Sequence, residues 1–228
     1  MEEKNKAWKT VSSKYLFRRP WLTVRCEDML LPNGNHIPEY YILEYPDWVN
    51  TIAITKEGKF VFVCQYRPGI GRTCYELCAG VCEKEDASPL VSAQRELWEE
   101  TGYGNGNWQE YMVISANPST HTNLTYCFLA TDVELIDHQH LEATEDLSVH
   151  LLTLEEVKRL LDNNEIMQAL NAAPLWKYIA SLQLSHTYIP FTHNQEVWAA
   201  KFRPPCLFSW RHIDKSHFIL CKLPLYRA

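Results

Sequence analysis

The sequence predicts an α+β fold, because strand-like and helix-like segments occur in separate blocks and not as alternating βαβ units. Residues 10 to 80 show the apolar–polar alternation and the turn residues of consecutive strands. The period changes to that of a helix at Pro89, after which strands resume and two more helical segments follow. These observations favour a mixed domain preceded by a small antiparallel sheet.

Composition places the chain among ordinary globular proteins, with 46% hydrophobic and 22% charged residues in a length of 228. The formal net charge of −6 gives no electrostatic basis for binding nucleic acid or anionic lipid, so neither is expected as a partner. The polar start MEEKNKAWKT does not resemble a signal peptide, and no apolar run is long enough to span a membrane. We therefore expect a cytoplasmic protein whose eight cysteines are reduced.

The first strands are expected to form a small antiparallel sheet over about residues 10 to 45. Asn33-Gly34 is a strong signal for a hairpin turn, and HIPEYYILEY alternates in the manner of a strand after it. A second unit begins at Asp47-Trp48, where NTIAIT and FVFVCQY flank a KEGK turn as a further hairpin. TCYELC then adds another short strand.

A helix is expected from Pro89 to just before Gly102. Proline suits the first turn of a helix, and glycine suits the position just past its end. Leu90, Ala93 and Leu97 fall on one face of this segment, which is the face expected to be buried.

Strands are expected again at EYMVISA, LTYCFLATDV and LSVHLLT. Thr153 and Glu156 form a capping box for a following helix, and a last helix is expected over much of APLWKYIASLQL. Beyond about residue 184 the charge reverses, because six Lys/Arg against two Asp/Glu give +4 and leave −10 for the rest. We therefore divide the chain into an N-terminal sheet (1–45), a central domain (46–183) and a C-terminal extension of unknown role (184–228).

RELWEETGY, residues 95 to 103, places three glutamates on one helix face, since Glu96, Glu99 and Glu100 follow the i, i+3, i+4 spacing. Like charges at this spacing repel each other. One interpretation is a solvated acidic face on which Arg95 pairs with Glu99. The other is a site for a hard divalent cation such as Mg²⁺, which takes oxygen ligands. The helix alone does not decide between them.

The surrounding stretch ELCAGVCEKEDASPLVSAQRELWEETGY resembles the Nudix box, the signature of the Nudix hydrolases. That pattern is Gly, five residues, Glu, seven residues, then Arg-Glu-apolar-x-Glu-Glu-x-Gly-apolar. The positions that match are Gly80, Arg95, Glu96, Leu97, Glu99, Glu100, Gly102 and Tyr103. The resemblance implies the Nudix fold, a mixed-sheet α/β/α sandwich, and hydrolysis of a nucleoside diphosphate linked to another group.

The loop of the box is one residue longer than the pattern, because fourteen residues separate Gly80 from Arg95 instead of thirteen. The first Glu of the pattern, which is mainly a structural partner in the family, must be replaced, and Glu85 and Asp86 are the candidates. We expect activity to survive this departure. Cys78 stands where related sequences commonly have the proline of ELPAG.

The resemblance assigns metal ligation to the helix and to the strand before it. It implies Glu96 and Glu100 as ligands of Mg²⁺, which Mn²⁺ can replace, with Glu99 assisting and the Ala79 carbonyl as a further ligand. Arg95 is implied to orient a carboxylate through charge-assisted hydrogen bonds. Divalent ions would relieve the repulsion among the glutamates, neutralise a pyrophosphate and lower the pKa of bound water.

From about residue 14 to residue 184 the chain resembles the ADP-ribose and nucleoside diphosphate sugar pyrophosphatases, through DWVNTIAI, FVFVCQYRPG and YELCAG. This branch implies that Arg67 binds the substrate phosphates and that Trp48 helps to form the nucleoside pocket. Pro118 lies 15 residues past Tyr103, where the branch has a proline. The alternatives are a surface arginine and a core tryptophan.

The loop LEATEDLSVHLLTLEEV resembles the segment that supplies the catalytic base in this branch. The glutamate of the family aligns nearest to Ala143, so Glu142 and Glu145 are the candidate bases. The N-terminal sheet of the branch commonly joins two chains, with pockets built across the interface. Residues 10 to 45 therefore predict a homodimer.

The implied function is Mg²⁺-dependent hydrolysis of ADP-ribose to AMP and ribose 5-phosphate. Two alternatives stay open: a pyrophosphatase for another nucleotide sugar such as GDP-mannose or UDP-glucose, and a non-catalytic ADP-ribose-binding Nudix sensor that regulates transcription. The intact glutamates argue against the sensor, as does a tail too short for a winged helix. The sequence leaves undecided the preferred sugar and base, the number of metal ions, and which glutamate is the base.

Overall fold

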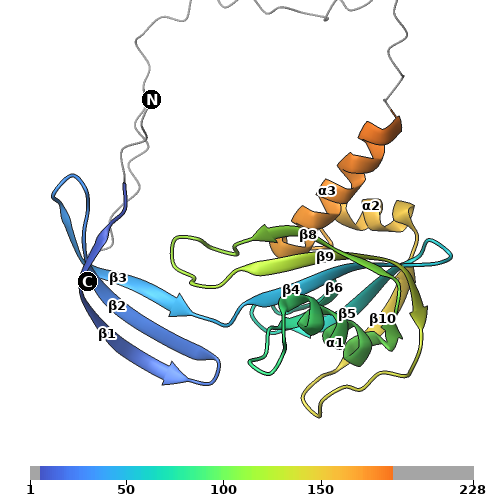
Figure 1. Cartoon of the computed structure of the whole chain (residues 1–228), viewed down its shortest axis with the longest axis horizontal. Coiled ribbons are helices and arrows are strands. Elements are labelled where there is room, and N and C mark those ends of the chain that lie inside the picture. Colours follow the sequence, from blue (N-terminus) through green and yellow to red (C-terminus); the bar gives the residue numbers. More distant parts are fainter. Residues whose placement is uncertain (1–5, 187–228) are drawn as a thin grey trace, which may run out of the picture. The chain divides into compact units, whose positions relative to one another are not determined.

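The computed structural model describes residues 6–186 (Figure 1). All but the first three residues of the C-terminal extension, 184–228, lie outside this range, so the structure does not bear on the predicted extension. Within the described part of the chain, no helix is long and apolar enough to cross a membrane.

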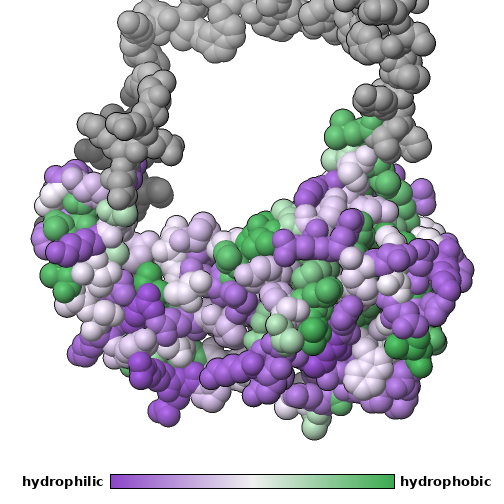
Figure 2. All heavy atoms as spheres, in the orientation of Figure 1, coloured by the Kyte–Doolittle hydropathy of each residue, from purple (hydrophilic) through white to green (hydrophobic). Residues whose placement is uncertain are grey.

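A three-stranded antiparallel sheet occupies the N-terminal part, as the sequence predicted. Its strands are β1 (Lys9–Arg19), β2 (Leu22–Leu30) and β3 (His36–Glu44), in the order β1-β2-β3. The turn between β2 and β3 contains Gly34, whose φ of 85° is the left-handed conformation that glycine tolerates. β1 is exposed along its whole length. Apolar residues lie among polar ones on this sheet in Figure 2, and the large exposed ones near β1 are Trp8, Val11, Tyr15, Leu16, Phe17, Trp21 and Leu22.

The strands that follow form a second, seven-stranded sheet. Its order is β10-β5-β6-β4-β9-β7, with β8 paired to β9. The β4–β9 pair is parallel and the other pairs are antiparallel, so the sheet is mixed, as expected for the predicted fold. The strands are β4 (Trp48–Thr55), β5 (Phe60–Arg67), β6 (Arg72–Val81), β7 (Tyr103–Gly104), β8 (Asn107–Ile114), β9 (Thr125–Leu135) and β10 (Leu147–Leu152).

Helices cover both faces of this sheet (Figure 1). α1 (Pro89–Thr101) packs on one face through Ala93 and Leu97, and α2 (Leu154–Asp162) and α3 (Ala169–His186) pack on the other. Alternate residues of β5 join different cores: Phe60 and Phe62 contact the α2–α3 side, whereas Val61 contacts the α1 side. The α/β/α sandwich predicted from the sequence is confirmed.

The predicted ends of α1 and the start of α2 are also confirmed. Ser88 caps α1 ahead of Pro89, and Gly102 ends it in the left-handed conformation, with φ 75°. Thr153 and Glu156 form both hydrogen bonds of the capping box at α2.

α3 begins at Ala169, earlier than expected, and contains Pro174. Proline has no N–H to donate to the carbonyl four residues before it, which is that of Leu170. That carbonyl instead accepts a hydrogen bond of 2.7 Å from the side-chain amide of Asn50 on β4. The bond from Asn50, which replaces the missing helical one, therefore connects the first turn of α3 to the central sheet.

Candidate active site

The glutamate helix α1 lies against the end of β6, and a glycine permits the close contact. A Cβ atom built at Gly80 would overlap the carboxylate of Glu96, so no other residue fits there without displacing that side chain. One residue earlier, the Ala79 N–H donates to Glu100 Oε2 at 3.2 Å. The strand and the helix thus hold two of the three predicted carboxylates beside the backbone at residues 79 and 80.

Arg95 joins the helix to the loop of the box. Its Nη1 donates to Glu96 Oε1 and Glu99 Oε2, each at 2.9 Å, and its Nη2 donates to the Val81 carbonyl and to Asp86 Oδ2, each at 3.0 Å. Arg95 thus forms the i, i+4 pair with Glu99, and its bond to Glu96 is the kind of contact expected of a residue that orients a carboxylate.

Of the two candidate replacements, Asp86 and not the exposed Glu85 pairs with Arg95; Glu83 of the same loop also lies near it, at 4.0 Å. Asp86 is the sixth residue after Gly80, the position at which the pattern has its first Glu. The extra residue of the loop therefore lies between Asp86 and Arg95. The hydrogen bond from Arg95 lowers the pKa of the Asp86 carboxyl, which keeps this partner ionised.

Glu96 and Glu100 are poorly solvated, whereas Glu99 is about a third exposed, so the helix face as a whole is not a solvated acidic face. Glu100 is only 5% exposed. Burial raises its pKa to about 8, and the charges of Glu96 and Glu145 act in the same direction. Burial also raises the pKa of Glu96, although Arg95 offsets part of that rise. One guanidinium among clustered, buried carboxylates leaves an excess of negative potential, and these oxygen donors fit a hard divalent cation.

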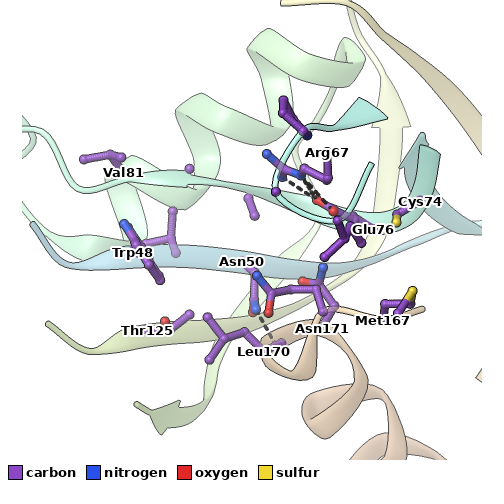
Figure 3. Close-up of a pocket in the computed structure, with 17 residues that line it drawn as sticks. Trp48, Asn50, Arg67, Cys74, Glu76, Val81, Thr125, Met167, Leu170 and Asn171 are labelled. Carbon is purple, nitrogen blue, oxygen red and sulfur yellow. Dashed lines mark hydrogen bonds and ion pairs between the residues drawn. The ribbon is translucent and has the colours of Figure 1, made fainter. Parts of the chain in front are cut away.

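A cavity of about 560 Å³ lies beside this cluster, on the α3 side of the sheet (Figure 3). Ala79, Gly80 and Val81 line one part of it, which places the cavity next to the strand that contacts the glutamates. Trp48 and Arg67, both predicted to bind substrate, line it as well. Met167, Gln168, Leu170 and Asn171, from the start of α3 and the residues just before it, close another side. The volume is that of a small-molecule site.

Arg67 is held in place by a buried acid that the sequence interpretation missed. Its Nε donates to both carboxylate oxygens of Glu76, at 2.9 and 3.1 Å, and its Nη2 donates to the same group. Figure 3 shows the pair at the wall of the cavity. Glu76 is only 3% exposed. A charged residue within the otherwise apolar strand YELCAG was the signal that would have found it.

Two further wall residues, Asn50 and Thr125, have buried polar atoms. Asn50 Oδ1 and Thr125 Oγ1 have no hydrogen-bond partner among residues 6–186, although both residues line the cavity. Asn171, from α3, lines the cavity beside them (Figure 3). Unpaired buried polar atoms are uncommon in folded proteins and indicate a water or ligand partner. No local sequence pattern identifies these residues, because β4, β9 and α3 meet only in the folded chain.

The remaining predicted residues lie in loops. Pro118 is in the β8–β9 loop and does not line the cavity. Glu142 and Glu145 share a turn between β9 and β10, in which the Glu142 N–H donates to Glu145 Oε2 at 2.9 Å. Only Glu145 of these two is a main contributor to the raised pKa of Glu100. Its charge therefore acts on the carboxylate cluster more strongly than that of Glu142.

Buried carboxylates around an arginine, next to a cavity with a second fixed arginine, define a site suited to a divalent cation and an anionic substrate. The family model of the NUDIX domain matches residues 45–198 of this chain. A second model, the nucleoside diphosphate sugar hydrolase N-terminal domain, matches residues 8–43. The chain belongs to the Nudix family.

Similar proteins agree with this assignment. The chain is 31% identical to the ADP-ribose pyrophosphatase of Bacillus subtilis (strain 168) over 165 residues, which cover 72% of this chain and 88% of that protein. It is 30% identical to the methanol dehydrogenase activator of Bacillus methanolicus over 166 residues, covering 70% and 89%. The crystal structure of an ADP compounds hydrolase matches with a TM-score of 0.69 and 20% identity, over 80% of this chain and 98% of that one. That last likeness concerns the fold.

Proposed function

We propose that this protein hydrolyses the pyrophosphate bond of ADP-ribose or a related nucleoside diphosphate sugar, giving a nucleoside monophosphate and a sugar phosphate. The observation that carries the proposal is the buried Glu96–Glu100 cluster, which meets the cavity wall at Ala79 and Gly80. The 31% identity to an ADP-ribose pyrophosphatase supports this choice of substrate. The cluster also favours an enzyme over a sensor, since its charge suits a catalytic cation.

The residues that would hold Mg²⁺, or Mn²⁺ in its place, are Glu96, Glu99, Glu100 and the Ala79 carbonyl. A divalent ion bound there would supply neutralising charge for the pyrophosphate and acidify water. Gly80 and Arg95 position these ligands: the glycine leaves room for Glu96, and the arginine fixes the orientation of Glu96 and Glu99.

The chain's own groups then bind substrate and accept a proton. Arg67, held by Glu76, is proposed to bind the phosphates, and Trp48 to contact the nucleoside. Glu145 is the preferred proton acceptor for the attacking water, because its charge already acts on Glu100, with Glu142 as the alternative. Pro118 is proposed to take part in the substrate site only through its loop, in which the Thr120 carbonyl accepts a hydrogen bond from the Leu43 N–H of β3.

We also propose a cytoplasmic homodimer. The N-terminal sheet (1–45) would join the chains, because β1 is exposed throughout and large apolar residues lie along it. Residues 46–183 would form the catalytic domain, with 184–228 as an extension of undetermined role. The described cysteines are all free thiols, which suits a reducing compartment. Sedimentation equilibrium tests the dimer; a monomer at micromolar concentration would contradict it.

Product analysis tests the function. The full chain is incubated with Mg²⁺ and ADP-ribose, GDP-mannose or UDP-glucose, and the products are separated by anion-exchange chromatography. We expect AMP and ribose 5-phosphate from ADP-ribose, at a higher kcat/KM than for the other two substrates. A preference for GDP-mannose would favour the other-sugar alternative. Tight binding of ADP-ribose without turnover would favour a sensor.

A further inference from the structure

The chain segment 137–140 lies against the C-terminal end of α1, outside the cavity. Gly102, which ends α1, offers its carbonyl to the backbone N–H groups of Ile136 and Asp137, at 2.9 and 3.1 Å. The His140 N–H donates to the Glu99 carbonyl at 2.8 Å, and Gln139 Nε2 donates to the Glu100 carbonyl at 2.8 Å. The segment is thus fixed to the same helix turn that presents the glutamates.

Three metal-ligating side chains converge in this segment. Asp137 Oδ1 lies 2.7 Å from His138 Nδ1, and Asp137 Oδ2 lies 3.0 Å from His140 Nε2. One ligand atom from each residue can be chosen so that all lie within 4.8 Å of one another. The hydrogen bond with His140 and that from the His138 N–H lower the pKa of Asp137 to about 2, so the carboxylate is ionised at neutral pH.

His140 is held in position by more than its ion pair. Its ring stacks on Trp98 of α1, with centroids 4.2 Å apart and planes at 29°. The ring of His138 lies 4.3 Å from that of His140. One imidazole is therefore packed against the helix, whereas the other belongs to a side chain that is 78% exposed.

We propose that Asp137, His138 and His140 form a second metal site, for a borderline transition-metal ion such as Zn²⁺. Two imidazoles and one carboxylate are a ligand set that Zn²⁺ takes with water as the fourth ligand. The set differs in kind from the oxygen ligands of the glutamate cluster, which suit Mg²⁺. The two sites therefore select different ions.

The observed geometry needs only a small adjustment to bind such an ion. Ligand atoms about 2.0–2.2 Å from Zn²⁺ in a tetrahedral site are about 3.4 Å apart. The present separations are all within 4.8 Å, and the exposed His138 side chain is the ligand with most room to adjust. The exposed aspartate–histidine pairs that would be exchanged for metal bonds contribute little stability in water.

A bound ion would stiffen the start of the loop that carries Glu142 and Glu145. Residues 137–140 would be cross-linked to one another while their backbone stays bonded to α1. We therefore expect zinc to slow amide hydrogen exchange across this segment, independently of turnover.

Zinc titration of the full chain by isothermal calorimetry, in saturating Mg²⁺, tests the site. His138→Ala removes an exposed ligand with little risk to the fold, and His36→Ala is the matched control, since His36 is also exposed and paired to an aspartate. We expect the wild-type protein and His36→Ala to bind one more Zn²⁺ than His138→Ala. Exchange in residues 137–140 should slow with zinc only in the first two.

Sites elsewhere in the chain, including its other histidines and cysteines, would remain in all three proteins and cancel in the comparison. Equal zinc stoichiometry in His138→Ala and the wild type, or equal loss in His36→Ala, would overturn the proposal. Absence of zinc binding by the wild type would do so as well.

Discussion

Raising the pH of the metal-free protein should destabilise it through Glu100. The folded state holds this carboxyl with a pKa of about 8, against 4.5 for an ordinary glutamate, because the group is buried beside other carboxylates. Between pH 4.5 and pH 8 the folded state keeps a proton that the unfolded state has released. The stability linked to this proton is complete below pH 4.5, so the free energy of unfolding falls as the pH rises through this window.

The size of the effect follows from the two pKa values. Their difference corresponds to on the order of 4 kcal/mol of stability lost by pH 8. For a domain of this size that loss lowers the melting temperature by on the order of 10 °C. The raised pKa of Glu96 acts in the same direction. The lowered pKa of Asp86 acts at more acidic pH and leaves this window unaffected.

Thermal melts in EDTA at pH 5 and pH 8 measure this loss of stability, with Glu100→Gln as the comparison. Glutamine keeps an acceptor for the Ala79 N–H but cannot ionise. We expect the variant to exceed the wild type in stability at pH 8 by a few kcal/mol and to match it near pH 5. Titration of histidines is common to both proteins and cancels. Parallel pH profiles for the two proteins would refute the reasoning.

Addition of Mg²⁺ completes the test. Binding to ionised Glu100 should restore stability to the wild type at pH 8, because an ion that binds only the folded state stabilises it. Glu100→Gln should respond much less. An equal response in both proteins would place the ion elsewhere.

Other substitutions separate the roles of the site residues. Gly80→Ala should lower kcat on the order of 100-fold while the protein stays folded, since its Cβ displaces Glu96; near-wild-type turnover would contradict this. Arg67→Ala should cost about 2 kcal/mol by leaving Glu76 buried and unpaired; Glu76→Gln in the same chain should restore stability but not activity, and recovery of activity would remove Arg67 from the substrate site. Glu145→Gln should lower kcat about 100- to 1,000-fold with little change in KM, whereas Glu142→Gln should stay near wild type; the reverse order would make Glu142 the base.

Local features of the fold were predictable because each depends on neighbouring residues. Pro89 and Gly102 mark the ends of α1 through their backbone preferences, and the Thr153–Glu156 box acts within one turn. The start of α3 was missed, because the helix begins at Ala169, ahead of the predicted segment, and contains Pro174. The Leu170 carbonyl that proline leaves unpaired finds Asn50, 120 residues away, and local sequence cannot reveal that partner.

The candidate site likewise contains residues that the sequence could identify and residues that it could not. The motif spacing located Glu96, Glu100 and Arg95, because helical periodicity brings them together. The buried partner of Arg67 lies on the next strand of a hairpin, only nine residues along the chain. The unpaired atoms of Asn50 and Thr125 instead depend on how strands from distant parts of the chain pair. Pairing of β4 with β9 in parallel, across 77 residues at Trp48 and Thr125, creates that part of the cavity wall.

Anomalous scattering from Mn²⁺ in crystals that also contain an ADP-ribose analogue with a methylene-bridged diphosphate is the most direct measurement. The account predicts a peak within bonding distance of the carboxylates of Glu96 and Glu100 and of the Ala79 carbonyl, with the diphosphate of the analogue beside Arg67. Crystals that contain the analogue but show no peak beside those carboxylates would contradict it.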